Sequence, residues 1–221
     1  MNLSSDTISV LKNFSDINQN ILIKPGNKIQ TISTMKNILA EAEVSEKFES
    51  EFAIYDLPEF LRSLDLFKSP ELKLNGGSYL TIQDSKSNKS VKYFFADKSV
   101  IVAPTKGITM PDTHVSFTLK KEDFADLQKG ITTLNLPDVA VIGNGKTINL
   151  VATDKKNKSS NDYSTVIGET DKTFTAYFKA ENFKMSSDDY DVAISKQKIS
   201  HFVNRNKAVQ YWIALEPDSE F

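Results

Sequence analysis

The sequence predicts an α+β protein built from two similar domains, in which helices pack on antiparallel β-strands. A strand-to-helix junction recurs along the chain, and a strand–turn–strand segment recurs at nearly the same spacing. Together these two observations indicate an internal duplication. The 221 residues have room for one large domain or for two of about 110 residues, each able to bury its own core.

The recurring junction is a short apolar run that is followed at once by a helix-start signal. In its first copy, Asp56 can accept hydrogen bonds from the free amides of a first helical turn, and Pro58 is tolerated there. The copies are residues 52–60, 117–124 and 175–183. The phenylalanines that align in these copies are expected to point under the sheet, and they are Phe60, Phe124 and Phe183.

A second correspondence supports the duplication. Residues 21–28 match residues 139–146 at an offset of 118, while residues 52–60 match residues 175–183 at an offset of 123. Two separate matches at nearly the same offset favour a duplicated domain over a chance likeness of short apolar runs.

The first half is expected to begin with a helix over residues 3–14, capped by Ser4 or Ser5. Strands are expected at 21–24, 28–34, 38–44 and 48–55, a helix at 56–67, and strands at 72–74, 79–82 and 91–95. The turn Asn75-Gly76-Gly77 and a loop over residues 85–90 join the last three strands into hairpins.

Residues 98–112 contain two prolines, a glycine and several apolar side chains. They are interpreted as an extended connector between a first domain, residues 1–97, and a second domain, residues 113–221. In the second domain we expect a strand at 114–119, a helix at 120–132, strands at 138–142, 147–152, 163–167 and 173–178, a short helix at 180–185, and strands at 190–194, 199–203 and 208–215. Each half would then hold two helices.

The composition narrows the class of protein. Hydrophobic residues make up 39% and charged residues 25%, which is typical of a globular protein. The chain has no long apolar run and no apolar N-terminal segment, so we expect neither a membrane span nor a signal peptide. Cysteine is absent, which fits a reducing cytoplasm. The net charge of −2 gives no basic bulk field, so a DNA-binding role would need lysines gathered on one surface.

No catalytic group of residues stands out, so we expect no enzyme, no cofactor and no metal site. The two histidines, His114 and His201, lie alone, without metal-ligand spacing. The segment Gly143-Asn144-Gly145 is interpreted as a hairpin turn and not as a phosphate-binding loop. Asp188 and Asp189 are adjacent, so on a strand they would face opposite sides.

Several blocks of sequence resemble the sliding clamp of T-even-type bacteriophages. They are residues 3–7, 11–14, 17–18, 53–57, 60–61, 102–104 and 214–219. The resemblance runs from end to end but is weaker at residues 65–90 and 155–200. It implies the DNA-clamp fold, a homotrimeric ring around double-stranded DNA, and helices that line the hole.

The same resemblance implies that basic residues of the lining contact DNA phosphates without reading sequence. These residues are Lys12, Arg62, Lys68, Lys120, Lys121, Lys129, Lys179 and Lys184. The alternative is that any one of them is an ordinary solvated side chain. Asn2 and Ser5 stand where the family tends to carry lysines, and the third helix carries Glu122, Asp123 and Asp126. The lining is therefore expected to be only mildly positive.

Ring closure would pair the strand edges of neighbouring subunits. By resemblance, these edges are residues 92–96 and 163–167, and the interface residues are Tyr93, Phe94, Phe95, Tyr163 and Val166. The alternative is that both strands are plain outer strands of a monomer.

Partner proteins are expected to dock where the connector meets the C-terminus, in a shallow apolar groove for the C-terminal tail of a polymerase. The groove residues would be Val100, Ile101, Val102, Pro104, Leu215 and Pro217, near Phe221. The alternative is that Val100 and Val102 pack inward as a normal strand.

The function that these expectations imply is that of a DNA polymerase processivity factor in the cytoplasm of the infected bacterial host. Its partners would be DNA, the replicative polymerase, an ATP-dependent clamp loader and, by family likeness, late-transcription factors. A viral structural protein built from duplicated β-rich domains is the alternative from another class. The strand-to-helix junctions favour the clamp, because a shell protein would not need a helix in each quarter of the chain.

Overall fold

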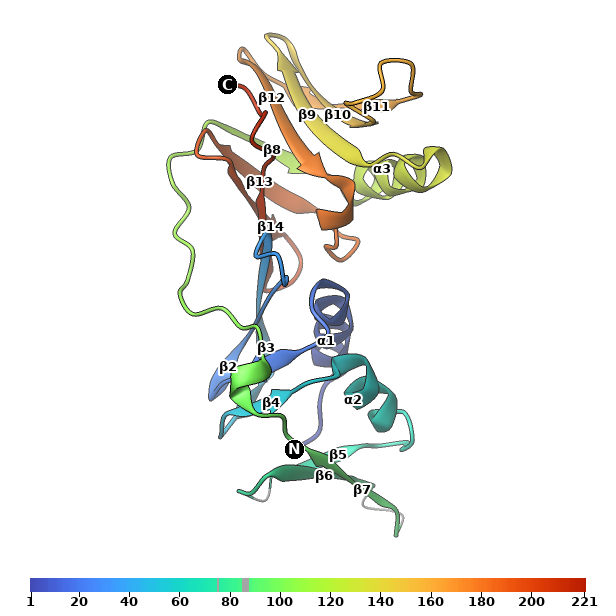
Figure 1. The fold of residues 1–221 in the computed structure, drawn as a ribbon, viewed down its shortest axis with the longest axis vertical. Coiled ribbons are helices and arrows are strands. Elements are labelled where there is room, and N and C mark those ends of the chain that lie inside the picture. Colours follow the sequence, from blue (N-terminus) through green and yellow to red (C-terminus); the bar gives the residue numbers. More distant parts are fainter. Residues whose placement is uncertain (75, 85–87) are drawn as a thin grey trace. The chain divides into compact units, whose positions relative to one another are not determined.

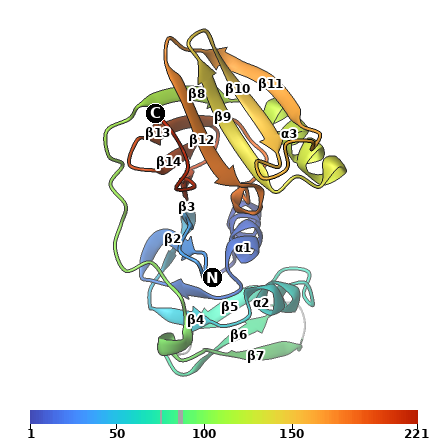
Figure 2. The same ribbon diagram turned by 45° about the horizontal axis from the view of Figure 1, so that its top comes forward.

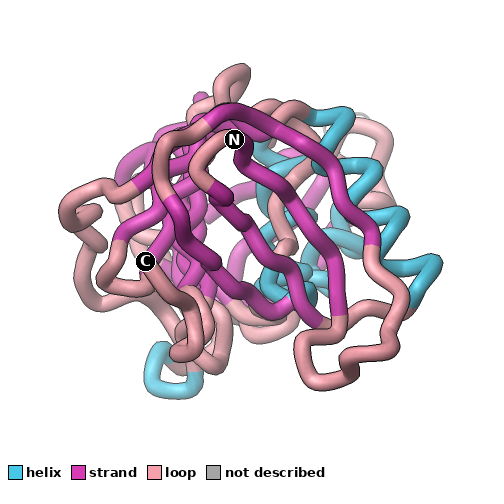
Figure 3. Tube along the Cα trace, turned by 90° about the horizontal axis from the view of Figure 1, so that it is seen from above, coloured by secondary structure: helices cyan, strands magenta, loops and turns pink. Residues whose placement is uncertain are grey.

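The computed structural model describes residues 1–74, 76–84 and 88–221, and its contacts divide the chain into two compact units, Met1–Lys106 and Gly107–Phe221 (Figure 1). The division falls inside the predicted connector, whose limits of 98 and 112 stay a prediction. Strands make up most of the regular structure (Figure 3).

The described residues of the first unit form two α-helices that pack against each other and small antiparallel sheets (Figure 1). Its elements are α1 (Ser5–Ile17), β1 (Ile21–Ile23), β2 (Gly26–Ile32), β3 (Ile38–Phe48), β4 (Phe52–Ile54), α2 (Leu57–Leu64), β5 (Glu71–Leu74), β6 (Tyr79–Gln83), β7 (Ser90–Phe94) and the single 3₁₀ turn η1 (Lys98–Val100). Strand β1 pairs with β4, β2 pairs with β3, and β5, β6 and β7 form a three-stranded sheet.

The second unit contains one α-helix beside a four-stranded sheet of order β11-β10-β9-β12 (Figure 2). A second sheet of this unit has the order β15-β14-β13-β8. The elements are β8 (Val115–Leu119), α3 (Lys121–Leu134), β9 (Asp138–Asn144), β10 (Thr147–Thr153), β11 (Tyr163–Glu169), β12 (Thr173–Lys179), the 3₁₀ turn η2 (Ala180–Asn182), β13 (Tyr190–Ser195), β14 (Ile199–Asn204) and β15 (Val209–Ala214).

The helix starts follow from local chemistry. Ser4 caps α1, its Oγ accepting from the amide of Thr7 at 3.2 Å. Asp56 caps α2, its Oδ1 accepting from the amide of Glu59 at 2.7 Å. Both caps satisfy amides that the first helical turn leaves without a backbone partner. The prediction for these two helix starts is confirmed.

The aligned phenylalanines lie in the cores of their units. Phe60, Phe124 and Phe183 expose 2%, 0% and 6% of their surface. In the second unit the rings of Phe124 and Phe183 lie 6.3 Å apart, so two of the repeated junctions meet in one core. All three are therefore buried, and their direction under the sheet stays a prediction.

The duplication is visible in backbone hydrogen bonds. The amide of Leu57 donates to the carbonyl of Gln19 at 2.7 Å, and the amide of Ala180 donates to the carbonyl of Pro137 at 2.9 Å. Gln19 and Pro137 are 118 positions apart, while Leu57 and Ala180 are 123 apart. These are the two offsets that the sequence comparison gave, so the repeated segments make the same contact in both units.

Several predicted elements differ in extent: α1 runs from Ser5 to Ile17, α2 ends at Leu64, and the strand expected at 48–55 is only Phe52–Ile54. Strand β3 runs to Phe48 instead of ending near 44, because Gly26 of β2 pairs with Phe48 across a bulge, and Glu46 in this stretch is hydrogen-bonded to the start of α1. The predicted helix at 180–185 is only the turn η2, since Phe183 leaves the helical region with φ −81° and ψ 58°. The second unit therefore has one α-helix within the described residues. Asn75 and residues 85–87 of the predicted turns lie outside the described residues.

Candidate nucleic-acid interface and strand edges

The first two helices each bury one face and expose a basic residue on the other. Helix α1 buries Leu11, Phe14 and Ile17, and Lys12 is exposed between them. Helix α2 buries four apolar side chains, and Arg62 in its last turn is exposed. A basic residue near the C-terminal end of a helix is favoured by the helix dipole. Both side chains are therefore available to a phosphate.

Helix α3 presents its lysines less freely. Lys120 is the N-cap residue of α3, and its side chain makes no capping hydrogen bond. Lys121 is the first residue of the helix, and its backbone amide donates to Asp189 Oδ1 at 2.7 Å. The Nζ atom of Lys129 lies 2.9 Å from Asp126 Oδ1, and this ion pair raises the pKa of Lys129. Both partners are solvent-exposed, so the pair is weak and open to competition from phosphate.

The charges on the three α-helices do not sum to a positive lining. Helix α1 carries one lysine and two aspartates, for a net charge of −1. Helix α2 carries one arginine and one glutamate, for a net charge of zero. Helix α3 carries two lysines and three acidic residues, for a net charge of −1. The total over the three helices is therefore −2. Any attraction to DNA must come from individual basic residues in favourable positions and not from a broad positive field.

The remaining basic candidates lie outside α-helices. Lys68 is exposed beyond the end of α2 at Leu64, and Lys184 is exposed after η2. Lys179 ends β12, and its Nζ atom lies 2.6 Å from Oδ1 of Asp138, whose side chain is 1% exposed. The hydrogen bond to Asp138 raises the pKa of Lys179. Lys179 thus neutralises a buried carboxylate inside its own unit.

Strand β7 forms one edge of the three-stranded sheet and pairs only with β6 within the described residues. The amide of Phe95 donates to the carbonyl of Ser78 at 2.8 Å, so by alternation the backbone groups of Phe94 point away from the sheet. The Phe94 side chain is 65% exposed. This edge therefore offers both free backbone groups and an apolar side chain.

Tyr93 and Phe95, the neighbours of Phe94 along the chain, pack against other side chains of the first unit. Tyr93 lies with its ring 5.2 Å from that of Phe60, and its hydroxyl donates to the carbonyl of Asp56 at 3.0 Å. Burial, together with Glu59 and Asp56, raises the pKa of Tyr93 to about 12. The ring of Phe95 stacks on Phe52 at 5.1 Å. Of the three predicted interface aromatics, Phe94 alone projects into solvent.

Strand β11 forms the matching edge of the four-stranded sheet, and it pairs with β10. Val166 is 60% exposed, while Tyr163 is part-buried against α3. A Cβ atom added to Gly130 of α3 would lie 2.8 Å from Cγ of Tyr163, so only glycine allows this approach. This role of Gly130 was not predicted from the sequence, although an isolated glycine inside a helical pattern is a signal for close packing.

The opposite edges of these two sheets are covered by the ends of the chain. The amide of Leu72 on β5 donates to the carbonyl of Met1 at 2.7 Å, and Asn2 forms a β-bridge with Glu71. On β12, Thr175 and Glu220 exchange two backbone hydrogen bonds of 2.9 Å. Among the described residues of the three- and four-stranded sheets, the edge strands without such a cover are therefore β7 and β11.

The residues of the predicted groove divide between the units. Val100 is 53% exposed, whereas Val102 is fixed by the side chains of Asn18, which donates to its carbonyl, and Asn20, which accepts from its amide. Ile101 is half-buried and Pro104 is buried in the first unit. In the second, Leu215 is 7% exposed and Pro217 is exposed. The groove itself stays a prediction.

Two further observations bear on the class of protein. Within the described residues, no cluster of three or more histidine and carboxylate side chains is arranged to hold a metal ion. No helix there is both long and apolar enough to cross a membrane.

Comparison with known proteins gives the family. Residues 4–103 match the family described as "DNA polymerase processivity factor", and residues 116–217 match the one described as "gp45 sliding clamp, C terminal". The sliding clamp of Vibrio phage KVP40 is 34% identical over 98% of this chain and 99% of that protein. The sliding clamps of Escherichia phage RB69 and Enterobacteria phage T4 are each 31% identical over 99% of this chain and 98% of theirs.

Solved structures show the same fold at low identity. A chain of the PCNA2–PCNA3 complex from Sulfolobus tokodaii superposes with a TM-score of 0.69 at 12% identity, covering 95% of both chains. Proliferating Cellular Nuclear Antigen from Entamoeba histolytica gives a TM-score of 0.68 at 15% identity, over 95% of this chain and 94% of that one. The predicted DNA-clamp fold is confirmed. The two family matches follow one another along the chain, and the relatives are similar to it over nearly its whole length. This protein therefore belongs to the sliding-clamp family of bacteriophages.

Proposed function

We propose that this chain is a DNA polymerase processivity factor, three copies of which close into a ring around duplex DNA. The observation that carries the proposal is the pair of free strand edges, β7 in the first unit and β11 in the second. Each edge presents one strongly exposed apolar side chain, Phe94 or Val166. Two different edges on one chain permit head-to-tail pairing, and such pairing forms a ring when the rotation closes.

The side chains of the two edges are compatible with a continuous sheet across the subunit boundary. On β7, and on β11 from Tyr163 to Ile167, exposed residues alternate with part-buried ones, and the part-buried Tyr93 and Tyr163 face α2 and α3. Pairing β7 with β11 would therefore place these helices on the same face of the joined sheet. That face would look toward the DNA.

Retention on DNA would be topological. The helices carry no positive surplus, so the basic residues Lys12, Arg62, Lys120, Lys121 and Lys129 would make weak, salt-sensitive phosphate contacts. Weak contacts suit sliding, because a tight site would hold the ring in one place. A polymerase bound to the ring would stay at high effective concentration beside the primer end.

The partners follow from this role. A replicative polymerase would dock by an apolar tail at the groove residues Val100, Ile101, Val102, Pro104, Leu215 and Pro217. An ATP-dependent clamp loader would open and close the ring, late-transcription factors would share the docking face, and the ring would work in the cytoplasm of the infected host. The chain itself would perform no catalysis.

Absolute mass in solution, measured by light scattering over a range of concentrations, tests the ring. The chain has a mass of 24.8 kDa, and we expect a species of three times that mass that dissociates on dilution. Retention on DNA then separates encirclement from ordinary binding, because a ring loaded on a closed circle should remain at high salt and leave once the circle is cut. A strict monomer with and without loader and DNA would refute the ring. An assembly much larger than a trimer would favour the structural-protein alternative.

A further inference from the structure

The face of β7 that points away from α2, here called its outer face, carries a cation beside an exposed aromatic ring. Lys92 and Phe94 lie on this face, because Tyr93 between them packs against Phe60 of α2. Both contact Tyr79 of β6, whose ring centroid lies 5.5 Å from that of Phe94 and 5.2 Å from the Nζ atom of Lys92. Lys92 forms no ion pair with any described residue. The outer face of β7 therefore offers an uncompensated positive charge next to an apolar surface.

Strand β11 carries the opposite charge on its corresponding face. Tyr163 packs against α3, so Ser164 and Val166 point to the outer face, and both are exposed. The register of β11 on β10 shifts between Val166 and Gly168, so Val166 and Glu169 lie opposite residues of β10 that are two positions apart. This bulge returns Glu169 to the outer face, where its side chain is exposed. In the described part of the chain, Glu169 has no ion-pair partner.

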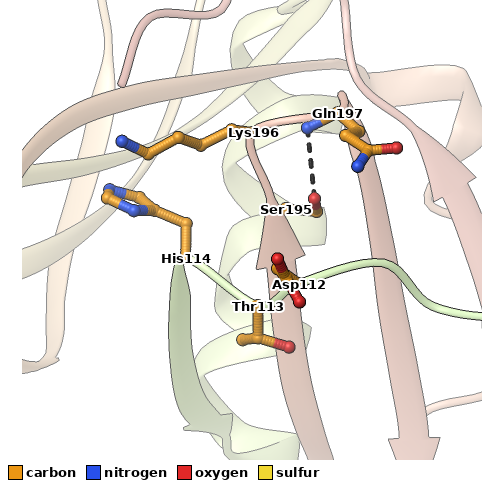
Figure 4. Close-up of a pocket in the computed structure, with 6 residues that line it drawn as sticks. All are labelled: Asp112, Thr113, His114, Ser195, Lys196 and Gln197. Atoms are coloured by element: carbon orange, nitrogen blue, oxygen red, sulfur yellow. Dashed lines mark hydrogen bonds between the residues drawn. The ribbon is translucent and has the colours of Figure 1, made fainter.

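The backbone around Glu169 is held in place by the turn that follows it. The amide of Thr170 donates to the carbonyl of Lys146 at 3.1 Å. The Nζ atom of Lys172 donates to the carbonyl of His114, which directly precedes β8 and lines a small hollow there (Figure 4). The turn is thus tied to two other segments of the second unit. The carboxylate of Glu169 therefore projects from a fixed position at the edge of the sheet.

The positions of two tyrosines indicate the direction in which the edges would pair. Tyr93 lies near the end of β7, Tyr163 begins β11, and each faces the helix of its own unit. Antiparallel pairing brings the end of one strand to the start of the other, so the two tyrosines and both helices would share one face. It would also continue the antiparallel order of both sheets. The pairing of β7 with β11 is that of the proposed ring, and the inference below rests on that proposal.

The side chains of the outer faces then distinguish between two registers. Phe94 has free backbone groups and must oppose a residue of β11 on the same face, which is Ser164 or Val166. Opposite Val166, Phe94 would cover an exposed apolar side chain, and Lys92 would lie opposite Glu169. Opposite Ser164, Phe94 would cover a hydroxyl group, and Glu169 would have no cation. The first register satisfies both the apolar and the charged side chains.

We propose that Lys92 and Glu169 determine how two copies of this chain join: β7 of one copy lies antiparallel to β11 of the next, with Phe94 opposite Val166 and Lys92 opposite Glu169. Apolar pairs and pairs of opposite charge stabilise neighbouring antiparallel strands, whereas like charges directly opposite destabilise them. Pairing of either edge with its own copy would bring two lysines, or two glutamates, to one face. The two charges therefore favour head-to-tail joining, which can close a ring, over a two-fold dimer.

Site-specific cross-linking tests the register, because the chain contains no cysteine and introduced thiols can pair only with each other. Full-length Phe94→Cys and Val166→Cys chains are mixed and mildly oxidised. A disulfide needs Cα atoms about 4.4–6.8 Å apart, and directly opposed residues of an antiparallel ladder lie about 4.5–5.5 Å apart. We expect a cross-linked dimer from the mixture and little from either variant alone.

A mixture of Phe94→Cys with Ser164→Cys is the matched control for the register. In the proposed register these residues lie about 7–8 Å apart on the diagonal, which exceeds the span of a disulfide. Their initial rate of cross-linking should therefore be at least about fivefold lower than that of the first mixture.

Charge reversal tests the ion pair by light scattering. Lys92→Glu and Glu169→Lys should each raise the dissociation constant of an interface about fivefold, because an attractive pair becomes a repulsive one. A chain that carries both changes should recover most of the affinity, since the pair is restored with its charges exchanged. Lys73→Glu makes the same change of charge at an exposed position on β5 of the same sheet and should alter the constant less than about twofold.

The outcomes separate this inference from the proposed ring. A monomer at every concentration, with and without loader and DNA, would refute the ring and the register together. A trimer in which Phe94→Cys cross-links to Ser164→Cys, or to itself, at least as fast as to Val166→Cys would overturn the register and leave the ring standing. A double charge variant that associates no better than the single ones would overturn the pairing of Lys92 with Glu169.

Discussion

Replacing Lys179 with methionine should destabilise the second unit, because it leaves a buried carboxylate without its cation. Asp138 is 1% exposed and Lys179 is 30% exposed, with 2.6 Å between Oδ1 and Nζ. Breaking a fully buried ion pair costs about 3–5 kcal/mol. The partial exposure of Lys179 and the remaining hydrogen bond, from the amide of Lys155 to Asp138 Oδ2 at 3.3 Å, reduce the expected loss to about 2–3 kcal/mol.

Urea unfolding followed by circular dichroism measures this loss as a lower midpoint with an unchanged slope. Lys156→Met, at an exposed position in the nearby loop, is the matched control and should change stability by less than about 0.5 kcal/mol. Adding Asp138→Asn to Lys179→Met should recover part of the loss, since the uncompensated charge is gone. Equal stability of Lys179→Met and the control, or a double variant less stable than the single one, would refute the account of this pair. A loss of DNA retention without any loss of stability would instead assign Lys179 to the DNA-facing set.

Three further predictions address the caps, the helix packing and the edge. Burial disfavours the charge on Glu46, but hydrogen bonds from Thr7 and Ser4 outweigh it and lower the pKa of Glu46. The stabilisation by the Glu46 carboxylate should be complete above its ordinary pKa of 4.5 and should be lost as the pH falls through the lower pKa of the folded state. The free energy of unfolding of wild type should therefore exceed that of Glu46→Gln by about 1 kcal/mol near pH 7, and this difference should disappear in acid. A difference that grows in acid would contradict the lowered pKa. Gly130→Ala should lower stability by about 1 kcal/mol despite the better helix propensity of alanine, and Tyr163→Ala in the same chain should remove the penalty; a stabilised Gly130→Ala would mean that Tyr163 yields easily. Phe94→Asp should raise the trimer dissociation constant at least about tenfold by light scattering, while Met35→Asp, at another exposed apolar position, should leave it unchanged; dissociation by both variants alike would exclude a special role for β7.

The parts of the fold that the sequence predicted are those set by neighbours along the chain. The cap by Asp56 acts over three residues, and the buried Phe60, Phe124 and Phe183 follow from a local strand-to-helix pattern. Contacts between distant residues could not be predicted. Glu46 reaches back to Ser4 and Thr7 at the start of α1, and Gly26 pairs with Phe48 across a bulge, so that β3 runs beyond its apparent end. A single glutamate in an alternating strand gives no sign of such a contact.

The candidate site shows the same division. The two edge strands were located from their resemblance to a family, and both lie at sheet edges in the structure. The basic residues were chosen by family resemblance and by their charge on or near the expected helices, and neither reveals a buried partner such as Asp138 for Lys179. The hydroxyl contact of Tyr93 and the close approach of Gly130 to Tyr163 depend on tertiary packing, which short patterns do not specify.

The coverage of β5 by Met1–Asn2 and of β12 by Glu220 has a practical consequence for anyone who handles this protein. Each end of the chain covers the edge of a strand whose backbone groups could otherwise pair with a strand of another molecule. An affinity tag fused directly to either end, or the removal of a few terminal residues, would uncover the edge of β5 or β12. An uncovered edge could pair with other molecules and lead to aggregation. Purification tags are better inserted in an exposed surface turn, such as residues 156–160 between β10 and β11.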